Sequence, residues 1–368
     1  MNSIFRTMVG AAALALGATQ MAAADTKLVY TSWFPGQSTL HTKVLTPFFE
    51  RVAADSNGSI SYELFTDGTV AGGRATLQAI RDGIADMGLI ANLYYPAELR
   101  YSAFLSEGST LVRDALVGAG AYNEMMLLNC PSCVSDFEEQ NIVPIAFHAT
   151  PPYVLMCNRP VTTAADMKGL RVRSVGAWAV WVDAAGGTSV NMTTQESYEA
   201  LERGQIDCTI GNAAWLIQSS LFDVVSHVNT MKLGTYAGGV PLNMNRDTWA
   251  DLDDAQREII RRNAAGAIMD IALEFGKEDD EALAMAGDRK VTLIEPSEDL
   301  VALFARQGEA EVGRLLSLAA QRQVSEPDAL LTKYRELLAK WEKIVDETGP
   351  DRDALAARLY DEVLAKLD

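Results

Sequence analysis

Hydrophobic and polar residues follow a recurring order in the first third of the chain. Residues 27–34 read as a strand, residues 39–54 place apolar side chains at helical spacing, and residues 59–65 alternate with period two. Residues 74–81 are helical up to a glycine, and residues 86–90 form a short apolar strand. The order β-α-β-α-β predicts a largely parallel sheet with helices on its faces.

The same order returns further along the chain. Strands are expected at residues 170–175, 189–192 and 206–210, with helices between them. Segments 79–86 and 200–207 both read A-[I/L]-x-x-G-x-x-D, in which the glycine permits the left-handed turn that ends a helix. The repetition predicts an α/β fold with two similar lobes.

The connecting segments predict how the lobes are joined. Asn141–Arg159 holds two strand-like runs divided by Pro151-Pro152, residues 235–244 read as a returning strand, and residues 247–289 read as almost unbroken helix. A helix of that length would tie both lobes together, with the crossing strands as a hinge. We expect a leader at 1–24 and lobe I at 25–148, with roughly 232–250 returning to that lobe. Lobe II is expected at 149–231. Residues 251–368 are expected to form the long spanning helix and C-terminal helices that pack on both lobes.

The first 24 residues have the pattern of a secretory signal peptide. Arg6 supplies the positive region, residues 8–16 are apolar but too short to span a bilayer, and Ala22-Ala23-Ala24 offers small residues, so cleavage is expected after Ala24. The alternative is a buried N-terminal helix. No other stretch approaches a transmembrane span. We therefore expect an exported protein without stable membrane insertion, which in a bacterium means the periplasm.

Charge and missing motifs narrow the function. The chain has 31 Lys and Arg against 49 Asp and Glu, a net charge of −18, and no basic run, which argues against a nucleic-acid partner. The sequence contains no GxSxG, SxxK, HExxH, P-loop or GxGxxG motif, and its three histidines lack metal-ligand spacing. We predict no metal, no cofactor and a binding protein rather than an enzyme.

Four cysteines leave two questions open. Cys130 and Cys133 have CxxC spacing, for which a structural disulfide is favoured, and a thiol-disulfide protein using this pair remains a rival. Cys157 and Cys208 lie at predicted strands and either pair or stay buried as small apolar residues.

Arg173 is the sharpest candidate for a ligand contact. It lies at the carboxyl end of a predicted strand, where ligands bind in open α/β sheets, and a helix that opens near Ala177 adds its positive end. Its planar guanidinium matches a carboxylate with two parallel hydrogen bonds. The alternative is a solvated strand-end charge or a surface ion pair.

Three motifs carry a resemblance to a known family. Asp166–Arg173 (DMKGLRVR) resembles a DLKGLKxR signature, Asn191–Asp207 resembles PxxxxExYxALxxGxxD, and Gly68–Arg74 resembles a GxLGG turn. These are features of the substrate-binding proteins of TRAP (tripartite ATP-independent periplasmic) transporters, the DctP-like family, and the similarity covers essentially the whole mature chain. The resemblance implies a two-lobe periplasmic binding protein fold, capture of a small organic acid, delivery to the TRAP membrane permease subunits, and a carboxylate clamp at Arg173.

Two departures from the family pattern bear on the ligand. Many relatives have a second arginine on the crossing strand, but Pro152–Leu155 contains none, and Cys208 stands where the family usually has glycine. The missing arginine argues against densely charged substrates. It favours a monocarboxylate with an apolar or cationic far end.

Aromatic and small polar residues complete the predicted site. Aromatic residues near strand ends or on the crossover are candidate ligand contacts, and they include Tyr94 and Tyr95. Their alternative role is packing. Trp181, Trp249 and Trp341 are assigned to the core or to helix surfaces. The resemblance places Asn92, Thr194 and Asn212 toward the ligand, with turn or cap roles as alternatives. The predicted substrate-binding set is Arg173, Trp178, Trp33, Asn92, Tyr153, Thr194, Asn212 and Trp215.

The expected mechanism is capture by lobe closure, without chemistry, in a monomeric protein. An exported enzyme acting on organic acids is one rival, and the thiol-disulfide protein is another. Within the binding class, a receptor that feeds a sensor or an ATP-driven importer is the nearest alternative.

Overall fold

The protein is described by a computed structural model over residues 26–367, so the predicted signal peptide at 1–24 lies outside the described residues. The strands are β1 (Thr26–Thr31), β2 (Ile60–Phe65), β3 (Met87–Gly88), β4 (Ile90–Ala91), β5 (Ile142–Pro152), β6 (Val154–Cys157), β7 (Arg171–Arg173), β8 (Thr188–Val190), β9 (Cys208–Gly211), β10 (His227–Asn229), β11 (Thr235–Asn245) and β12 (Thr292–Ile294). The α-helices are α1 (Thr46–Asp55), α2 (Thr76–Arg81), α3 (Arg100–Ser106), α4 (Ala115–Leu128), α5 (Pro131–Glu138), α6 (Gly176–Ala184), α7 (Ser197–Glu202), α8 (Trp215–Gln218), α9 (Arg246–Asp251), α10 (Asp254–Met285), α11 (Glu298–Arg322), α12 (Pro327–Thr348) and α13 (Arg352–Glu362). Short helical turns are η1 (Leu40–Leu45), η2 (Asn92–Tyr94), η3 (Ser109–Leu111), η4 (Ala164–Met167), η5 (Leu221–Asp223) and η6 (Leu364–Lys366).

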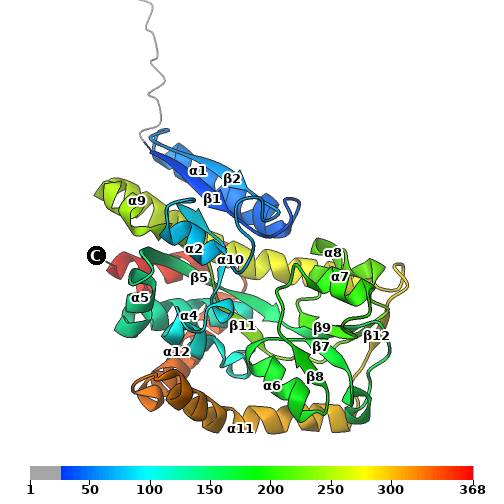
Figure 1. Ribbon diagram of the computed structural model, residues 1–368. Helices are drawn as coiled ribbons and strands as arrows, with labels where there is room; N and C mark the ends of the chain where they lie inside the picture. The colour runs from blue at the N-terminus through cyan, green and yellow to red at the C-terminus, as the bar shows by residue number, and fades with distance from the viewer. Residues whose placement is uncertain (1–25, 368) are drawn as a thin grey trace, which may run out of the picture.

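The strands form three sheets that divide into two lobes (Figure 1). The first lobe holds a sheet of order β2-β1-β3 and a sheet of order β4-β11-β5, and the second holds a sheet of order β12-β10-β6-β9-β7-β8. This is the mixed α/β, two-lobe fold that the sequence predicts. The residue limits predicted for the lobes, 25–148 and 149–231, stay a prediction.

Strand direction differs from the prediction of largely parallel sheets. β1 pairs in parallel with β2 and β3, and β7 with β8 and β9, as expected from the β-α-β order. β11 is antiparallel to β4 and β5, and β6 is antiparallel to β9 and β10. The antiparallel strands belong to the segments where the chain crosses between lobes, so each enters its sheet from the opposite end.

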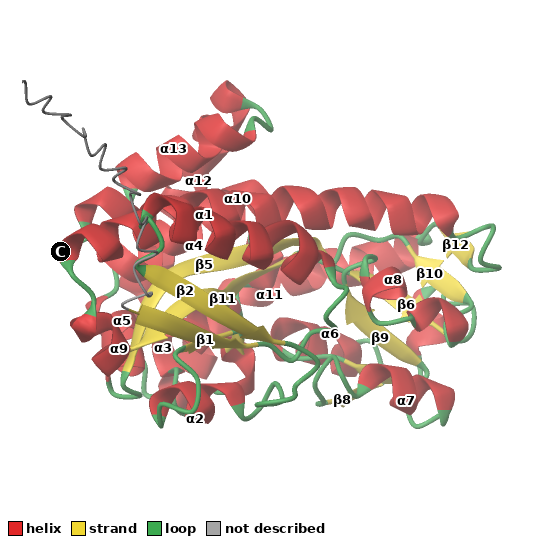
Figure 2. Cartoon of the chain, turned by 90° about the horizontal axis from the view of Figure 1, so that it is seen from above, coloured by secondary structure: helices red, strands yellow, loops and turns green. Residues whose placement is uncertain are grey.

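Helix α10 extends along both lobes (Figure 2). Its 32 residues correspond to a length of about 48 Å. The helix predicted at 247–289 is not continuous, because Leu252 and Asp253 separate α9 from α10. The Asp253 side chain accepts a hydrogen bond from the backbone nitrogen of Gln256 at 2.8 Å, and the Gln256 side chain accepts one from Asp253, which starts a new helix.

The hydrophobic core includes tryptophans that the sequence assigns to packing. Trp181 and Trp341 are both fully buried. Trp341 lies on Gly120 of α4, where a side-chain carbon would come within 2.1 Å of the indole ring, and its nitrogen donates to Glu124 at 2.7 Å. The C-terminal helix α12 is therefore fixed to the first lobe by both shape and hydrogen bonding.

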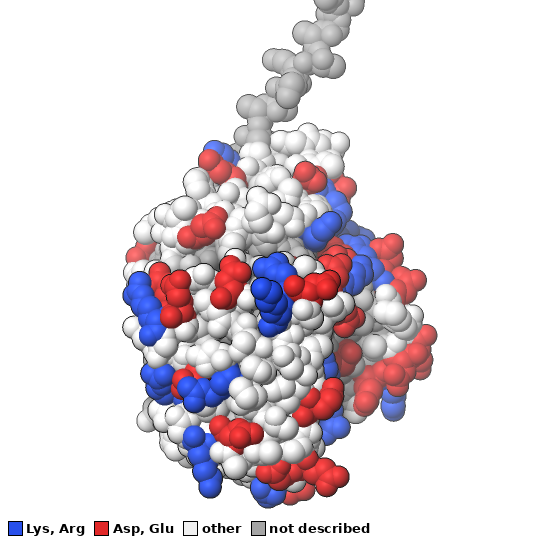
Figure 3. Space-filling view, turned by 90° about the vertical axis from the view of Figure 1, so that its right-hand side faces the viewer, with Lys and Arg blue, Asp and Glu red and all other residues white. Residues whose placement is uncertain are grey.

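Acidic and basic residues are interspersed on the face shown in Figure 3. The net negative charge is thus not gathered into one continuous acidic patch on that side. Within residues 26–367, every helix is too short or too polar to cross a bilayer.

Candidate functional site

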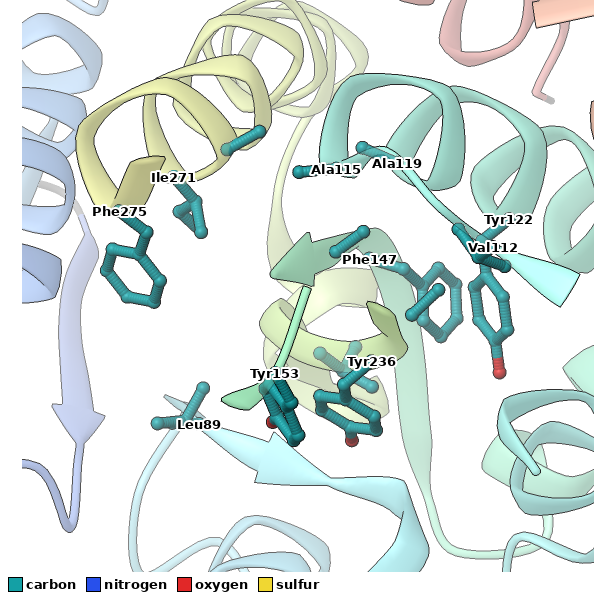
Figure 4. Close-up of a cluster of buried hydrophobic side chains, with 14 of the residues drawn as sticks. Leu89, Val112, Ala115, Ala119, Tyr122, Phe147, Tyr153, Tyr236, Ile271 and Phe275 are labelled. Atoms are coloured by element: carbon teal, nitrogen blue, oxygen red, sulfur yellow. The ribbon is translucent and has the colours of Figure 1, made fainter. Parts of the chain in front are cut away.

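A cavity of about 60 Å³ lies between the two lobes and α10. Most of its wall is apolar or aromatic, as in small-molecule sites. Figure 4 shows four lining residues from different elements: Phe275 of α10, Leu89 between β3 and β4, Tyr153 between β5 and β6, and Tyr236 of β11. The wall consists of Trp33, Phe34, Leu89, Ile90, Ala91, Leu93, Tyr94, His148, Thr150, Tyr153, Arg173, Val175, Trp178, Thr194, Asn212, Trp215, Tyr236, Gly239 and Phe275.

Arg173 is the charged residue of this wall and is only 2% exposed. Its Nε donates to the Met192 carbonyl at 3.1 Å, one terminal nitrogen to the Ile210 carbonyl at 3.2 Å, and the other to the Tyr94 hydroxyl at 3.2 Å. A guanidinium has five N–H groups, so one on each terminal nitrogen is left for a further acceptor. Two N–H groups are also what a bidentate contact with a carboxylate uses.

The Arg173 charge has no carboxylate partner in an ion pair within residues 26–367. The Glu196 carboxylate feels the positive charges of Arg74 and Arg173, but it accepts hydrogen bonds from the Thr193 hydroxyl at 2.7 Å and the Thr193 backbone at 2.6 Å. These bonds to Thr193 are the main reason why the pKa of Glu196 is lowered. A buried cation without a counterion is costly.

Aromatic rings form the surfaces beside the guanidinium. The Arg173 guanidinium lies 5.4 Å from the centre of the Trp215 ring. Tyr153 stacks on Trp178 with ring centres 4.5 Å apart, and its ring centre is 5.7 Å from that of Trp215. The Trp178 and Trp33 indoles donate to backbone carbonyls at 2.7 and 2.9 Å. Their polar edges are therefore satisfied, which leaves apolar surface for a ligand.

Seven of the eight predicted site residues line the cavity. They are Trp33, Tyr153, Arg173, Trp178, Thr194, Asn212 and Trp215. The structure does not bring Asn92 to the wall. Its amide nitrogen donates to Ser102, Ser106 and Tyr122, and its amide oxygen accepts from the Tyr236 hydroxyl at 2.8 Å. Asn92 therefore supports Tyr236 from behind instead of facing the cavity.

The helix after Arg173 begins within one residue of the position predicted near Ala177, but a protein carboxylate lies close to its first residue. α6 begins at Gly176, and a side-chain carbon there would lie 3.2 Å from a carboxylate oxygen of Glu107. Glu107 in turn binds Arg314 at 3.2 Å and Arg322 at 2.7 Å. A protein carboxylate thus already lies against this helix terminus, which leaves Arg173 as the charged group of the cavity.

Several lining residues were not in the predicted set. His148 and Thr150 come from β5, Tyr236 from β11 and Phe275 from α10. The residues themselves lie in segments that were predicted as strands or helix, but their positions in the cavity depend on long-range pairing of β5 with β11. A period-two pattern identifies a strand without identifying its partner.

The wall holds no aspartate or glutamate, so a pair of carboxylates for acid/base chemistry is absent from the described lining. Within the described part of the chain no cluster of three or more histidine, cysteine or acidic residues forms a metal site.

The cysteines form two disulfides, Cys130–Cys133 and Cys157–Cys208. Cys130 caps the start of α5, and both members of this pair are buried, Cys130 being 2% exposed. Thiol-disulfide exchange requires an accessible sulfur, so the burial favours a structural role. Cys157 and Cys208 face each other across the antiparallel β6–β9 pair, which answers the question that the sequence left open.

Two hydrogen bonds at the surface join the lobes beside the cavity. Arg74 donates to the Asn191 side chain at 2.8 Å, and the Gly73 backbone nitrogen donates to the Gln195 side chain at 3.2 Å. Together with the Tyr94–Arg173 bond, they hold the lobes closed around the cavity.

Two lobes that close over a cavity between them are the architecture of a solute-binding protein. Residues 31–312 match the DctP family, bacterial extracellular solute-binding protein family 7, and the chain belongs to that family. A solute-binding protein from Albidiferax ferrireducens is 24% identical over 287 residues, which are 76% of this chain and 83% of the relative. The family is one of transport proteins, not of enzymes.

Solved structures show the same fold. A TRAP solute-binding protein from Rhodoferax ferrireducens, in complex with copurified benzoate, has a TM-score of 0.78 and 20% identity, covering 87% of this chain and 99% of that one. A marine metagenome TRAP protein specific for aromatic acids, in complex with metahydroxyphenylacetate, has a TM-score of 0.77 and 21% identity, covering 86% and 99%. The chain therefore shares the two-lobe architecture of these structures.

Proposed function

We propose that this protein captures a small organic monocarboxylate with an apolar, aromatic-sized body and delivers it to the membrane permease subunits of a TRAP transporter. The observation that carries the proposal is the burial of Arg173, 2% exposed and without an acidic ion-pair partner in residues 26–367. A ligand carboxylate would supply the missing charge and accept the two remaining N–H groups.

The rest of the wall supports one carboxylate and an apolar body. Arg173 is the lone Lys or Arg among the residues that line the cavity, so a second carboxylate would lack a cationic partner. The faces of Trp178, Tyr153 and Trp215 offer flat apolar surface beside the guanidinium. Benzoate and metahydroxyphenylacetate, which occupy the two structures above, have this chemistry.

The setting follows from the N-terminal pattern and the family. We place the mature protein in the periplasm as a monomer after removal of residues 1–24, with its ligand exchanged by opening and closing of the lobes. Closure would bring Tyr94 of the first lobe to Arg173 of the second, so both lobes would contact a ligand held there.

Thermal shift of the mature chain with a panel of acids tests the proposal. Benzoate, phenylacetate, mandelate, succinate and glucuronate are compared, and a ligand at a hundred times its dissociation constant adds about 2.7 kcal/mol to the free energy of unfolding. We expect the aromatic monocarboxylates to raise the melting temperature. Arg173→Ala should abolish the shift.

Arg171→Ala is the matched control. Arg171 lies two residues earlier on the same strand, but its side chain is exposed and pairs with Asp207 at 3.0 Å. This variant should keep the ligand-induced shift. A shift that survives in Arg173→Ala, or a panel that leaves the wild type unchanged, would contradict the proposal.

A further inference from the structure

Asp279 is a buried carboxylate of α10 that lies behind the cavity wall. It is 5% exposed and is not among the residues that line the cavity. Its Oδ1 accepts a hydrogen bond from the Ala214 backbone nitrogen at 2.7 Å, and the carboxylate also accepts from the Ala213 backbone and the Asn212 side chain. One side chain of the long helix thus receives three donors from the segment that follows β9.

These donors belong to the turn that leads from β9 into α8. The hydrogen bonds of the turn itself begin with the Trp215 nitrogen, which donates to the Asn212 carbonyl at 3.1 Å. The nitrogens of Ala213 and Ala214 come before this bond and need an acceptor from elsewhere. Both residues are buried, so loss of Asp279 would leave two buried N–H groups without their acceptor, which costs free energy.

The conformation of this turn decides where the Trp215 ring lies. A side-chain carbon on Gly211 would be 2.0 Å from the ring, so the indole folds back closely over the turn. The Arg173 guanidinium lies 5.4 Å from the centre of the same ring, and one of its terminal nitrogens donates to the Ile210 carbonyl at 3.2 Å. A displacement of the turn would therefore move the ring away from the guanidinium.

The same stretch of α10 supports the wall at two further points. Glu278, the residue before Asp279, is buried and accepts a hydrogen bond from the side chain of Gln218 at the end of α8. Phe275, one helical turn earlier on the same face, lines the cavity itself. The spanning helix thus holds both ends of α8 and also contributes a wall residue.

The charge state of Asp279 suits a group that receives several donors. Burial is the main cause that raises its pKa to about 6, while the hydrogen bonds and the charge of Lys232 act in the opposite direction. The carboxyl group is therefore mostly ionised at neutral pH, and both of its oxygens are acceptors. An asparagine at this position would keep the shape but only one acceptor oxygen.

We propose that Asp279 is a positioning residue of the binding site, which holds the 212–215 turn so that the Trp215 ring stays beside the Arg173 guanidinium. Asp279 acts through the turn and does not itself contact the ligand. This inference rests on the proposed function, because it takes the ligand carboxylate to lie at Arg173 and the apolar body to lie against Trp215.

Calorimetric titration of the mature chain with benzoate tests the proposal. We expect Asp279→Ala to weaken binding at least about tenfold, and Asp279→Asn, which keeps one acceptor, to weaken it about threefold. Asp136→Ala is the matched control. Asp136 is also a buried carboxylate with a backbone donor, the Tyr101 nitrogen at 2.6 Å, but neither residue lines the cavity. This control should lose stability and keep its benzoate affinity within about twofold.

A double-mutant cycle separates positioning of Trp215 from a general loosening of the fold. In a Trp215→Leu background, Asp279→Ala should weaken benzoate binding by less than about threefold, because the ring that it positions is already absent. A loss as large as in the wild-type background would overturn the proposal, as would equal losses of affinity in Asp279→Ala and Asp136→Ala.

Failure of this inference is distinguishable from failure of the proposed function. Benzoate binding that needs Arg173 but is unchanged in both Asp279 variants would overturn the role of Asp279 and leave the proposed function standing. If neither benzoate nor the other acids of the panel bind the wild type, the proposed function falls and the inference with it.

A measurement without ligand covers the case in which Asp279→Ala does not fold. The chain has six tryptophans, so its indole N–H signals in ¹⁵N spectra are few, and the Trp215 signal is the one missing in Trp215→Leu. We expect this signal to shift in Asp279→Asn and to stay in place in Asp136→Asn. An unmoved Trp215 signal in Asp279→Asn would overturn the proposal.

Discussion

The phenolic oxygen of Tyr94 lies 3.2 Å from a terminal nitrogen of Arg173, so a residue of the first lobe accepts a hydrogen bond from the guanidinium of the second. The same oxygen accepts from the backbone nitrogen of Thr194 at 3.2 Å. With two donors directed at this oxygen, the Tyr94 proton is free to point toward a ligand acceptor. One hydroxyl thus orients the guanidinium and joins the lobes.

Tyr94→Phe should weaken binding of the best acid about tenfold, because the guanidinium loses an acceptor and the closed state loses a bond between the lobes. Calorimetry gives the dissociation constant. Tyr95→Phe is the control, since the Tyr95 hydroxyl donates to the Gly73 carbonyl at 2.7 Å and Tyr95 is outside the cavity wall. Equal losses in both variants would contradict the assigned role of Tyr94.

The surface bonds between the lobes should control how long a ligand stays. Replacing Asn191 and Gln195 together by alanine removes the contacts with Arg74 and with the Gly73 backbone. Because these bonds are partly exposed, we expect the dissociation rate to rise about threefold to tenfold with little change in the melting temperature of the free protein. Stopped-flow displacement measures this rate, and an unchanged rate would show that the bonds do not stabilise the closed state.

The two disulfides should contribute unequally to stability. Cys157–Cys208 closes a loop with a sequence separation of 51 residues, and Cys130–Cys133 one of 3. Chain-entropy arguments give about 4 kcal/mol for the long loop and about 1.6 kcal/mol for the short one. Urea unfolding of the two double-alanine variants should therefore show the larger loss for the 157/208 pair. The reverse order would mean that packing around Cys130 outweighs loop entropy.

Asp136 should give the folding stability a pH dependence of known sign. Burial is the main cause that raises its pKa from 3.8 to about 6, although its carboxylate accepts from the Tyr101 backbone nitrogen at 2.6 Å. The folded state then holds this proton more tightly than the unfolded state, so the contribution is full below about pH 4 and is lost as the pH rises to about 6.

Asp136→Asn keeps an acceptor for the Tyr101 nitrogen and removes the titration. We expect the wild type, relative to this variant, to lose up to about 3 kcal/mol between pH 4 and pH 6, measured by denaturant unfolding across that range. Parallel stability profiles of the two proteins would contradict the raised pKa.

Local patterns predicted most elements and seven of the residues that line the cavity. The alternating pattern at residues 59–65 corresponds to β2. Arg173, which was chosen because it ends a predicted strand, does line the cavity. Trp178, Thr194 and Asn212 were predicted from their motif positions or from nearby strand ends, and they also line the cavity. These residues lie where the chain itself turns after a strand, so their place depends on local structure and on the β-α-β order.

The remaining residues depend on contacts that no local pattern encodes. His148 and Tyr236 reach the cavity because β5 pairs antiparallel with β11, nearly 90 residues later, through a register with several irregularities. Asn92 was misplaced for a related reason: its amide is surrounded by Ser102, Ser106 and Tyr122, which the following helices bring back to it. The break before α10 was readable, since Asp253 and Gln256 have capping-box spacing.

The near-complete burial of Arg173 affects the rate at which a ligand can exchange. A ligand cannot reach or leave a guanidinium that is 2% exposed unless the lobes part. Under the proposed function exchange would be gated, and the opening rate would set an upper limit on how many ligand molecules one copy of the protein releases each second. Under the proposed function, a tighter closed state would lengthen the residence of the ligand and slow its delivery.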